Sequence, residues 1–292
     1  MNAIMTAATG YTEKDLTVFL RSVEQHCKNV AVFLIVFQED YQEIEKLRQK
    51  YPFIKPVYVP RRSVKRFRRV YVWIAHLLKR MDYSQLPPLL QNLGSYPLHV
   101  VVERFLKMSE LLRDSDNDFE NVLLTDCRDV VLQKDPFELV NDKLVSGLEI
   151  EKIGNNSLNS YWVSSIYGEK FFNDVKDRKI ICVGVILGPA REVQKYLDLF
   201  CSEVWKHLPE VIKVEFGPDT AVHDYIIYTD LMESHLVDNH SGFIATIGLE
   251  GSDQISKDRV NRSIQVEGVT PAIIHQYDRH SDLLEFFKEK YC

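Results

Sequence analysis

The chain has few cysteines, no excess of basic charge and no long apolar run. Its five cysteines are odd in number and include no CxxC pair, so we expect reduced thiols in a cytosolic setting and no disulfide framework. The net charge of −6 argues against a general nucleic-acid-binding protein. The longest apolar run, residues 30–37, is far shorter than the roughly 18–20 residues that a membrane span needs. No basic segment followed by a long apolar one marks a signal peptide at the start. We therefore expect a soluble, cytoplasmic protein with no transmembrane segment and no nucleic-acid partner.

The first half of the chain alternates apolar strands with amphipathic helices. Strands are expected at residues 3–8, 30–37, 53–59 and 121–124, and helices from Thr12, at 41–50 and at 98–113. Thr12 and Asp15 have the spacing of a capping box. Alternation of this kind predicts βαβ units, and hence an α/β fold with a mixed, mostly parallel central sheet flanked by helices. We expect a single domain over residues 1–292.

The second half is patterned less regularly. Strands are expected at 180–187 and 272–274, helices after Pro189 and from Gly217, and a proline-rich loop at 86–97. Residues 238–242 are typical of a hairpin turn between two strands.

The segment Thr125-Asp126-Cys127-Arg128-Asp129 stands where a buried strand ends. Two carboxylates three residues apart at the exit of a core strand are costly unless a cation or a ligand takes up their charge. Divalent cations that carry nucleotide phosphates are held by such oxygen ligands. The competing interpretation is a plain turn in which Asp129 pairs with a neighbouring arginine.

His275 follows another short apolar strand, far along the chain. Two carboxylates and one imidazole, completed by a diphosphate, would make a suitable octahedral site for Mn²⁺ or Mg²⁺. A hydrogen-bonded structural histidine is the alternative.

Residues 61–69 contain six basic side chains interleaved with Val64 and Phe67. This basic run could be a solvated helix face, could flank a diphosphate, or could attract an anionic surface.

Several segments together resemble the GT-A glycosyltransferases. Residues 124–132, followed by Asp135-Pro136, are similar to the strand-borne DxD segment of that family. Residues 182–188 resemble its Asn-Ala-Gly-Val segment, and residues 217–228 its Asp-Gln helix. His275 matches the late metal-binding histidine of glycogenin-like members. The chain departs from the family in three ways: the acidic motif is DxxD, Cys182 replaces the asparagine, and the tail after the histidine is missing.

The resemblance implies a role for each matching position. Ala7, Ala8, Thr9 and Gly10 would hold the base and ribose of the nucleotide. Asp126, Asp129 and His275 would bind the metal, with Asp126 also near the ribose. The diphosphate or the sugar would be contacted by Arg104, Lys107 and Arg128, although Arg104 and Lys107 could equally be solvated. Residues 1–130 would form the half that binds the nucleotide sugar, and 131–292 the half that binds the acceptor.

Asp219 lies at the start of an expected helix, where it would orient or deprotonate the acceptor hydroxyl or simply cap the helix. We therefore expect a metal-dependent glycosyltransferase that uses Mn²⁺ or Mg²⁺. The expected donor is a nucleotide sugar, most simply a UDP-sugar, and the acceptor a hydroxyl of a glycan or glycoprotein. A sugar nucleotidyltransferase would normally need a glycine-rich loop after the first strand, where Gly10 stands alone. A catalytically silent module that binds glycans or anions remains a second alternative.

Overall fold

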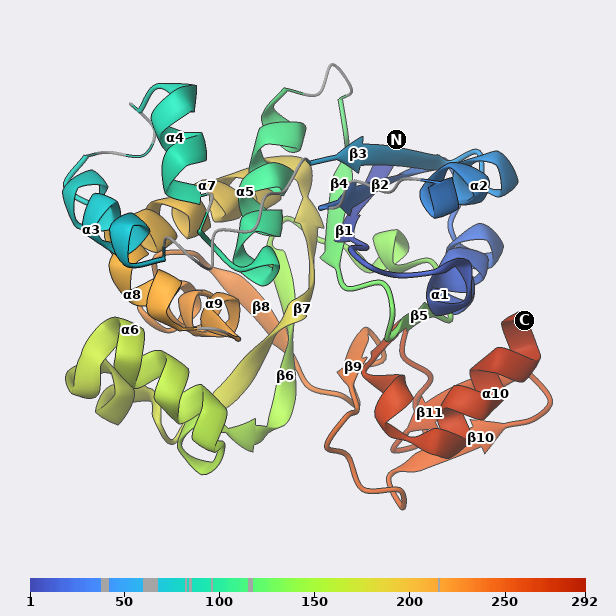
Figure 1. The fold of residues 1–292 in the computed structure, drawn as a ribbon. Helices are drawn as coiled ribbons and strands as arrows, with labels where there is room; N and C mark the ends of the chain where they lie inside the picture. Colours follow the sequence, from blue (N-terminus) through green and yellow to red (C-terminus); the bar gives the residue numbers. More distant parts are fainter. Residues whose placement is uncertain are drawn as a thin grey trace.

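The strand at the amino terminus lies inside a seven-stranded sheet that runs through the middle of the molecule (Figure 1). This is seen in a computed structural model that describes residues 1–37, 42–59, 68–81, 83, 86–95, 97–114, 118–214 and 216–292. The sheet order is β3-β2-β1-β4-β7-β6-β8, and four of its six pairings are parallel. The strands are β1 (Asn2–Ala7), β2 (Val30–Val36), β3 (Ile54–Tyr58), β4 (Asn121–Thr125), β6 (Leu144–Lys152), β7 (Lys179–Pro189) and β8 (Ser234–Val237).

The strands of this sheet bury both of their faces. In β1, Ala3 and Met5 pack into one hydrophobic cluster and Ile4 into another on the opposite face. Alternate residues of β4 divide in the same way, with Val122 and Leu124 on one side and Leu123 on the other. Successive side chains of a strand point to opposite faces, so a strand that is buried on both faces needs apolar residues at every position.

Ten helices are described, and they cover both faces of the sheet (Figure 1). They are α1 (Glu13–His26), α2 (Gln42–Lys50), α3 (Arg68–Leu78), α4 (Pro88–Ser95), α5 (Val100–Arg113), α6 (Ser157–Val175), α7 (Ala190–Lys206), α8 (Leu208–Lys213), α9 (Pro218–Tyr228) and α10 (Ser281–Tyr291). The expected capping box is present: Thr12 caps α1 and exchanges hydrogen bonds with Asp15.

Two smaller sheets lie towards the carboxyl terminus. One pairs β10 (Ile255–Asp258) with β11 (Ser263–Val266), and the other has the order β5-β12-β9. The latter contains β5 (Val130–Leu132), β12 (Ile273–His275) and β9 (Ile244–Thr246). Because β5 follows the acidic segment and β12 ends in His275, this small sheet brings two distant parts of the sequence together.

The mixed, mostly parallel sheet with flanking helices confirms the predicted fold class. Two local expectations were wrong. Residues 88–95 of the expected loop form α4, because a proline is tolerated in the first turn of a helix. Residues 238–242 join β8 and β9, which lie in different sheets, so they make no hairpin. Residues 61–67 of the basic run lie outside the described residues.

None of the helices in the described part of the chain is long and apolar enough to cross a bilayer.

Candidate active site

A cavity of about 480 Å³ opens beyond the carboxyl ends of β1 and β4. Residues from both ends of the sequence line it, among them Thr9 after β1, Asp126 after β4 and His275 at the end of β12. In open α/β sheets, ligands bind outside the carboxyl ends of the strands. The cavity therefore lies where this type of fold places a ligand.

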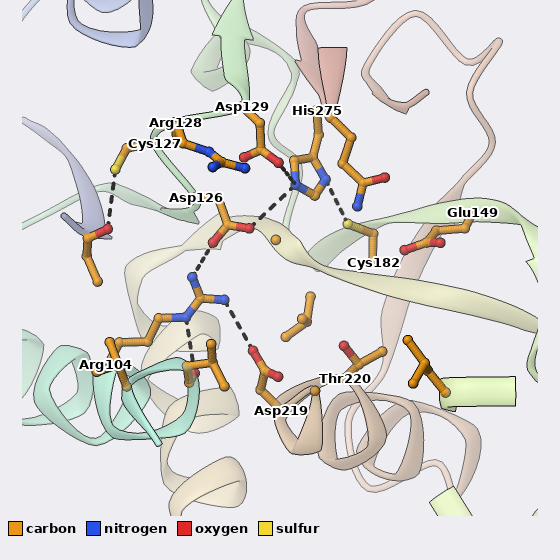
Figure 2. A pocket seen from close by; sticks show the side chains of 18 of the residues that line it. Arg104, Asp126, Cys127, Arg128, Asp129, Glu149, Cys182, Asp219, Thr220 and His275 are labelled. Atoms are coloured by element: carbon orange, nitrogen blue, oxygen red, sulfur yellow. Dashed lines mark hydrogen bonds and ion pairs between the residues drawn. The ribbon is translucent and has the colours of Figure 1, made fainter. Parts of the chain in front are cut away.

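Asp126, Asp129 and His275 form one cluster in the wall of the cavity (Figure 2). Nε2 of His275 lies 3.5 Å from Oδ2 of Asp126 and 3.7 Å from Oδ2 of Asp129. One potential ligand atom from each residue falls within 4.8 Å of the other two. Two carboxylate oxygens and an imidazole nitrogen are a donor set that suits Mn²⁺ or Mg²⁺.

The cluster is assembled by strand pairing. In the antiparallel ladder between β12 and β5, His275 lies opposite Val130, the residue after Asp129. The backbone N–H of Gln276 then donates to the carbonyl of Asp129 at 2.8 Å. Gln276 has a φ of 62°, a left-handed conformation that is uncommon without glycine and is often found at functional sites.

Gly184 of β7 leaves room for the cluster. The backbone N–H of Asp126 donates to the carbonyl of Gly184 at 2.9 Å. A Cβ at position 184 would lie 2.5 Å from Cε1 of His275 and 2.8 Å from Oδ2 of Asp126. Only glycine therefore allows the strand to pass this close to both side chains.

Arg104 connects the acidic segment with helix α9 (Figure 2). Its guanidinium donates to Asp126 through Nη1 and lies 3.3 Å from Oδ2 of Asp219 through Nη2. Nε of the same group donates to the carbonyl of Val101 at 3.2 Å. Arg104 and Asp219 are both buried, so each charge depends on the other for compensation.

Burial and the neighbouring charges shift the pKa values of the acidic residues and of His275, some upward and some downward. Burial favours neutral Asp126, but Arg104 and His275 outweigh burial and hold its pKa well below the usual range. Burial raises the pKa of Asp129, with His275 opposing the shift. Burial also raises the pKa of Asp219, to about 6, against the attraction of Arg104. For His275, burial favours the neutral ring, yet Cys182 and Asp129 hold the pKa well above its usual value. The carboxylates thus favour a positive charge at this point, which a divalent cation would supply.

The far side of the cavity is formed by α6, α9 and β6. Trp162 and Asn159 of α6, Thr220 of α9 and Glu149 of β6 all line it. Oδ1 of Asn159 is buried and has no hydrogen-bond partner within the described part of the chain. Burial raises the pKa of Glu149, while His275 and Arg279 oppose the shift. This side offers an aromatic ring together with polar atoms that can receive hydroxyl groups.

No protein-family profile and no curated protein matches the sequence. Among solved structures, an active-site mutant of LgtC aligns with a TM-score of 0.51 and 13% identity, over 98% of this chain and 95% of that one. The galactosyltransferase LgtC in complex with donor and acceptor sugar analogs aligns with a TM-score of 0.49 and 14% identity, over the same shares of the two chains. The fold is the GT-A fold.

Within this GT-A fold, most of the residues singled out from the sequence meet at one cavity. The cavity is lined by Ala7, Thr9, Arg104, Asp126, Arg128, Asp129, Asp219 and His275. Ala8, Gly10 and Lys107 do not line it. Lys107 instead pairs with Glu110 on the same helix, at 2.8 Å. The roles of all these residues in binding or catalysis stay predictions.

Two alternative interpretations can be compared with the geometry. Arg128 forms its ion pair with Asp278, at 3.2 Å, rather than closing a turn onto Asp129. Asp219 lies in the first turn of α9 and also faces Arg104, so its place in the helix does not exclude a place in the site.

Sequence reasoning missed Tyr11, Glu149, Asn159, Trp162 and Thr220 as lining residues. Tyr11 directly follows the loop that was singled out, and Thr220 directly follows Asp219. These two could have been found by extending each motif by one residue. The other three lie on β6 and α6, for which the sequence carries no clear periodic signal.

Proposed function

We propose that this chain is a metal-dependent glycosyltransferase that moves a sugar from a nucleoside-diphosphate sugar onto a hydroxyl of a glycan or glycosylated acceptor. The observation that carries the proposal is the convergence of Asp126, Asp129 and His275 at the carboxyl edge of a GT-A sheet. The DxxD segment would serve as the DxD motif of such enzymes. Because His275 matches the late metal-binding histidine of glycogenin-like members, we propose that the enzyme is similar to them.

Asp126, Asp129 and His275 would hold Mn²⁺ or Mg²⁺. The bound ion would neutralise the charge that develops on the departing nucleoside diphosphate. The cluster fits this ion because its two carboxylates and one imidazole are already gathered, with Gly184 leaving the necessary space. Sγ of Cys182 lies 3.1 Å from Nδ1 of His275 and would orient the imidazole so that Nε2 faces the ion.

The nucleoside would lie against the loop that leaves β1. Ala7, Thr9 and Tyr11 line the cavity there. The hydroxyl of Thr9 accepts a hydrogen bond from the backbone N–H of Phe37 at 3.0 Å, which fixes the loop against β2. Burial raises the pKa of Tyr11, so its phenol stays neutral and its ring can stack on a base. The nucleotide that we propose for this space is UDP, as the resemblance to GT-A enzymes implies.

The sugar would lie between Arg104, Asp219 and the far side of the cavity. Arg104 would balance the negative charge of a diphosphate, and its pairing with Asp219 fixes the direction of that carboxylate. Asp219 would orient the acceptor hydroxyl, or take its proton once ionised. Trp162 would contact the acceptor, with its ring against a sugar face, and Asn159 would lie beside it in the wall of the cavity.

A cytoplasmic location is part of the proposal. The five cysteines are all free thiols, which is consistent with a reducing compartment.

Calorimetry with UDP and Mn²⁺ tests the proposal. We expect UDP binding to depend on Mn²⁺ and to weaken roughly tenfold or more in Asp129→Asn, because a direct ligand is lost. Asp142→Asn, which changes an exposed aspartate in a loop, is the matched control and should bind as the wild type does. The absence of any metal-linked nucleotide binding would rule the proposal out.

A turnover assay separates an enzyme from a silent module. The wild type is expected to hydrolyse or transfer from a UDP-sugar with Mn²⁺ and to stop in EDTA. Metal-linked UDP binding without any turnover over a panel of nucleotide sugars would favour the silent module instead. Turnover that persists in EDTA would remove the metal from the proposal.

A further inference from the structure

Six large apolar side chains are exposed on helix α3, on the turn after it and on helix α4. They are Val70, Trp73, Leu77, Met81, Leu89 and Leu93, and we refer to them as the α3–α4 face. Trp73 is 65% exposed and Leu89 is 78% exposed. Single exposed apolar residues are ordinary, but a group of this size on two packed helices usually marks a contact surface.

The exposed residues of α3 form a stripe that the fold does not use. Val70, Trp73 and Leu77 are spaced by three and four residues, so they lie along one side of the helix. Ala75 and Leu78, which point the other way, are the residues that α3 buries in the core. Helix α3 therefore has two apolar sides, and within the described part of the chain only one of them packs into a core.

The α3–α4 face is held firmly on the protein. The indole N–H of Trp205 in α7 donates to the carbonyl of Leu78 at the end of α3, at 3.0 Å. The same indole lies against Gly94 of α4, where a Cβ would be 2.2 Å from the ring. Figure 1 shows α3 and α4 together at the edge of the molecule, outside α7 and α8.

The sequence around α3 is strongly basic. Residues 60–81 contain eight lysines and arginines and no acidic residue. The other residues carry 28 basic against 42 acidic side chains, a net charge of −14. Two of the eight cations, Lys79 and Arg80, lie in the described turn beside Leu77 and Met81. Lys79 pairs with Glu210 of α8 at 3.6 Å, so the substitution that tests the charge is placed at Arg80. The positive charge of the chain is thus concentrated in the segment that exposes the apolar stripe.

We propose that the α3–α4 face docks on an anionic lipid bilayer. A helix with an exposed tryptophan and aliphatic stripe lies in the interfacial layer of a membrane, and neighbouring cations attract the lipid phosphates. A second copy of this chain is a poorer occupant, because a symmetric contact would bring two basic segments together. The inference concerns a peripheral contact and does not depend on the proposed function.

Sedimentation with lipid vesicles tests the inference. The full chain is mixed with vesicles of phosphatidylcholine alone or with phosphatidylglycerol added, at about 0.1 M salt. We expect binding to the anionic vesicles only, and a loss of binding as salt is raised. Trp73→Ala combined with Leu77→Ala should weaken binding roughly tenfold, and Arg80→Gln about fivefold.

Val260→Ser is the matched control, because Val260 is 91% exposed and lies far along the chain from α3. It should bind vesicles as the wild type does. All variants change exposed side chains, so unchanged circular dichroism and melting are expected and are measured alongside. Tryptophan fluorescence should shift to the blue on addition of anionic vesicles and should lose this shift in Trp73→Ala.

Three results would overturn the inference. One is an absence of sedimentation with anionic vesicles at low salt. Another is equal binding by the wild type and the Trp73→Ala, Leu77→Ala protein. The third is a dimer in solution that the same double substitution splits into monomers, because a second copy would then cover the α3–α4 face.

Discussion

Arg104 and Asp219 form a buried ion pair, with 3.3 Å between Nη2 and Oδ2. The other arm of the same guanidinium donates to Asp126. One cation on α5 therefore compensates two carboxylates, one at the exit of β4 and one in the first turn of α9. A single side chain thus links these three elements at the cavity.

Arg104→Met should destabilise the fold severely. The substitution keeps most of the side-chain volume but leaves buried Asp219 without its cation and Asp126 with His275 alone. Breaking a buried pair in this way lowers the free energy of unfolding by about 3–5 kcal/mol. Urea unfolding at pH 7 measures the loss.

Arg113→Met is the control for that experiment. Arg113 pairs with Asp198 at 2.6 Å, and both side chains are about half exposed. An exposed pair contributes about 0–1 kcal/mol, so the control should remain close to the wild type. Equal losses in the two variants would show that Arg104 does not hold the site together.

Asp219 should make stability depend on pH. Burial raises the pKa of Asp219 to about 6, whereas an unfolded aspartate titrates near 4. The folded state then binds the proton more tightly, so the stabilisation is complete below about pH 4 and is lost as pH rises through about 6. Between pH 4 and 7 the wild type should lose about 3 kcal/mol relative to Asp219→Asn.

Urea unfolding of both proteins at several pH values gives this difference. The comparison with Asp219→Asn cancels the other carboxylates whose pKa is raised, such as Asp224. A difference that stays constant from pH 4 to pH 7 would show that folding does not raise the pKa of Asp219.

Much of the fold could be predicted because its central strands bury both faces. Eight consecutive apolar residues at 30–37 have few other structures available to them. The region of β6 and α6 could not be predicted, since α6 buries only four of its 19 residues and contains Gly168 with a φ of 82°. Its position is decided by packing against α9 and by pairing of β6 with β7, and neither leaves a local pattern.

The cluster of Asp126, Asp129 and His275 could be anticipated in part from strand ends. Asp126 follows the apolar run of β4 and His275 ends that of β12, whereas Asp129 directly precedes β5. The sequence does not show that the antiparallel pairing of β5 with β12 brings the last two together. Lys107 shows the limit of the same reasoning. Lys107 lies one helical turn from Arg104, yet it pairs with Glu110 and does not line the cavity. Nothing in the helical spacing distinguishes Lys107 from Arg104.

Gly184→Ala should displace the acidic cluster. The added Cβ would meet Cε1 of His275 at 2.5 Å and Oδ2 of Asp126 at 2.8 Å, and both of these side chains are held by other contacts. We expect the free energy of unfolding to fall by about 1–3 kcal/mol, as for other overpacked sites. Metal-linked UDP binding, followed by calorimetry, should be lost.

Gly251→Ala is the matched control. There the Cβ would meet Oδ1 of Asp253, the end of an exposed side chain that can move aside. Stability and binding should stay near the wild-type values. If Gly184→Ala also keeps metal-linked binding, the close approach of β7 is not needed to form the cluster.

Cys182 should control the affinity for the metal through His275. Its Sγ lies 3.1 Å from Nδ1, on the opposite side of the ring from Nε2, which faces the two carboxylates. Removing such an outer partner of a metal-binding histidine typically weakens metal binding by about 10–100-fold. Cys182→Ala should therefore weaken Mn²⁺ binding in the presence of UDP, measured by calorimetry.

Two serine variants are the controls for Cys182→Ala. Cys182→Ser keeps a hydrogen-bonding atom and should retain most of the wild-type affinity for Mn²⁺. Cys292→Ser changes an exposed thiol and should leave the affinity unchanged. Wild-type affinity in Cys182→Ala would mean that the backbone hydrogen bond from Gln276 to Asp129 is enough to orient the ring.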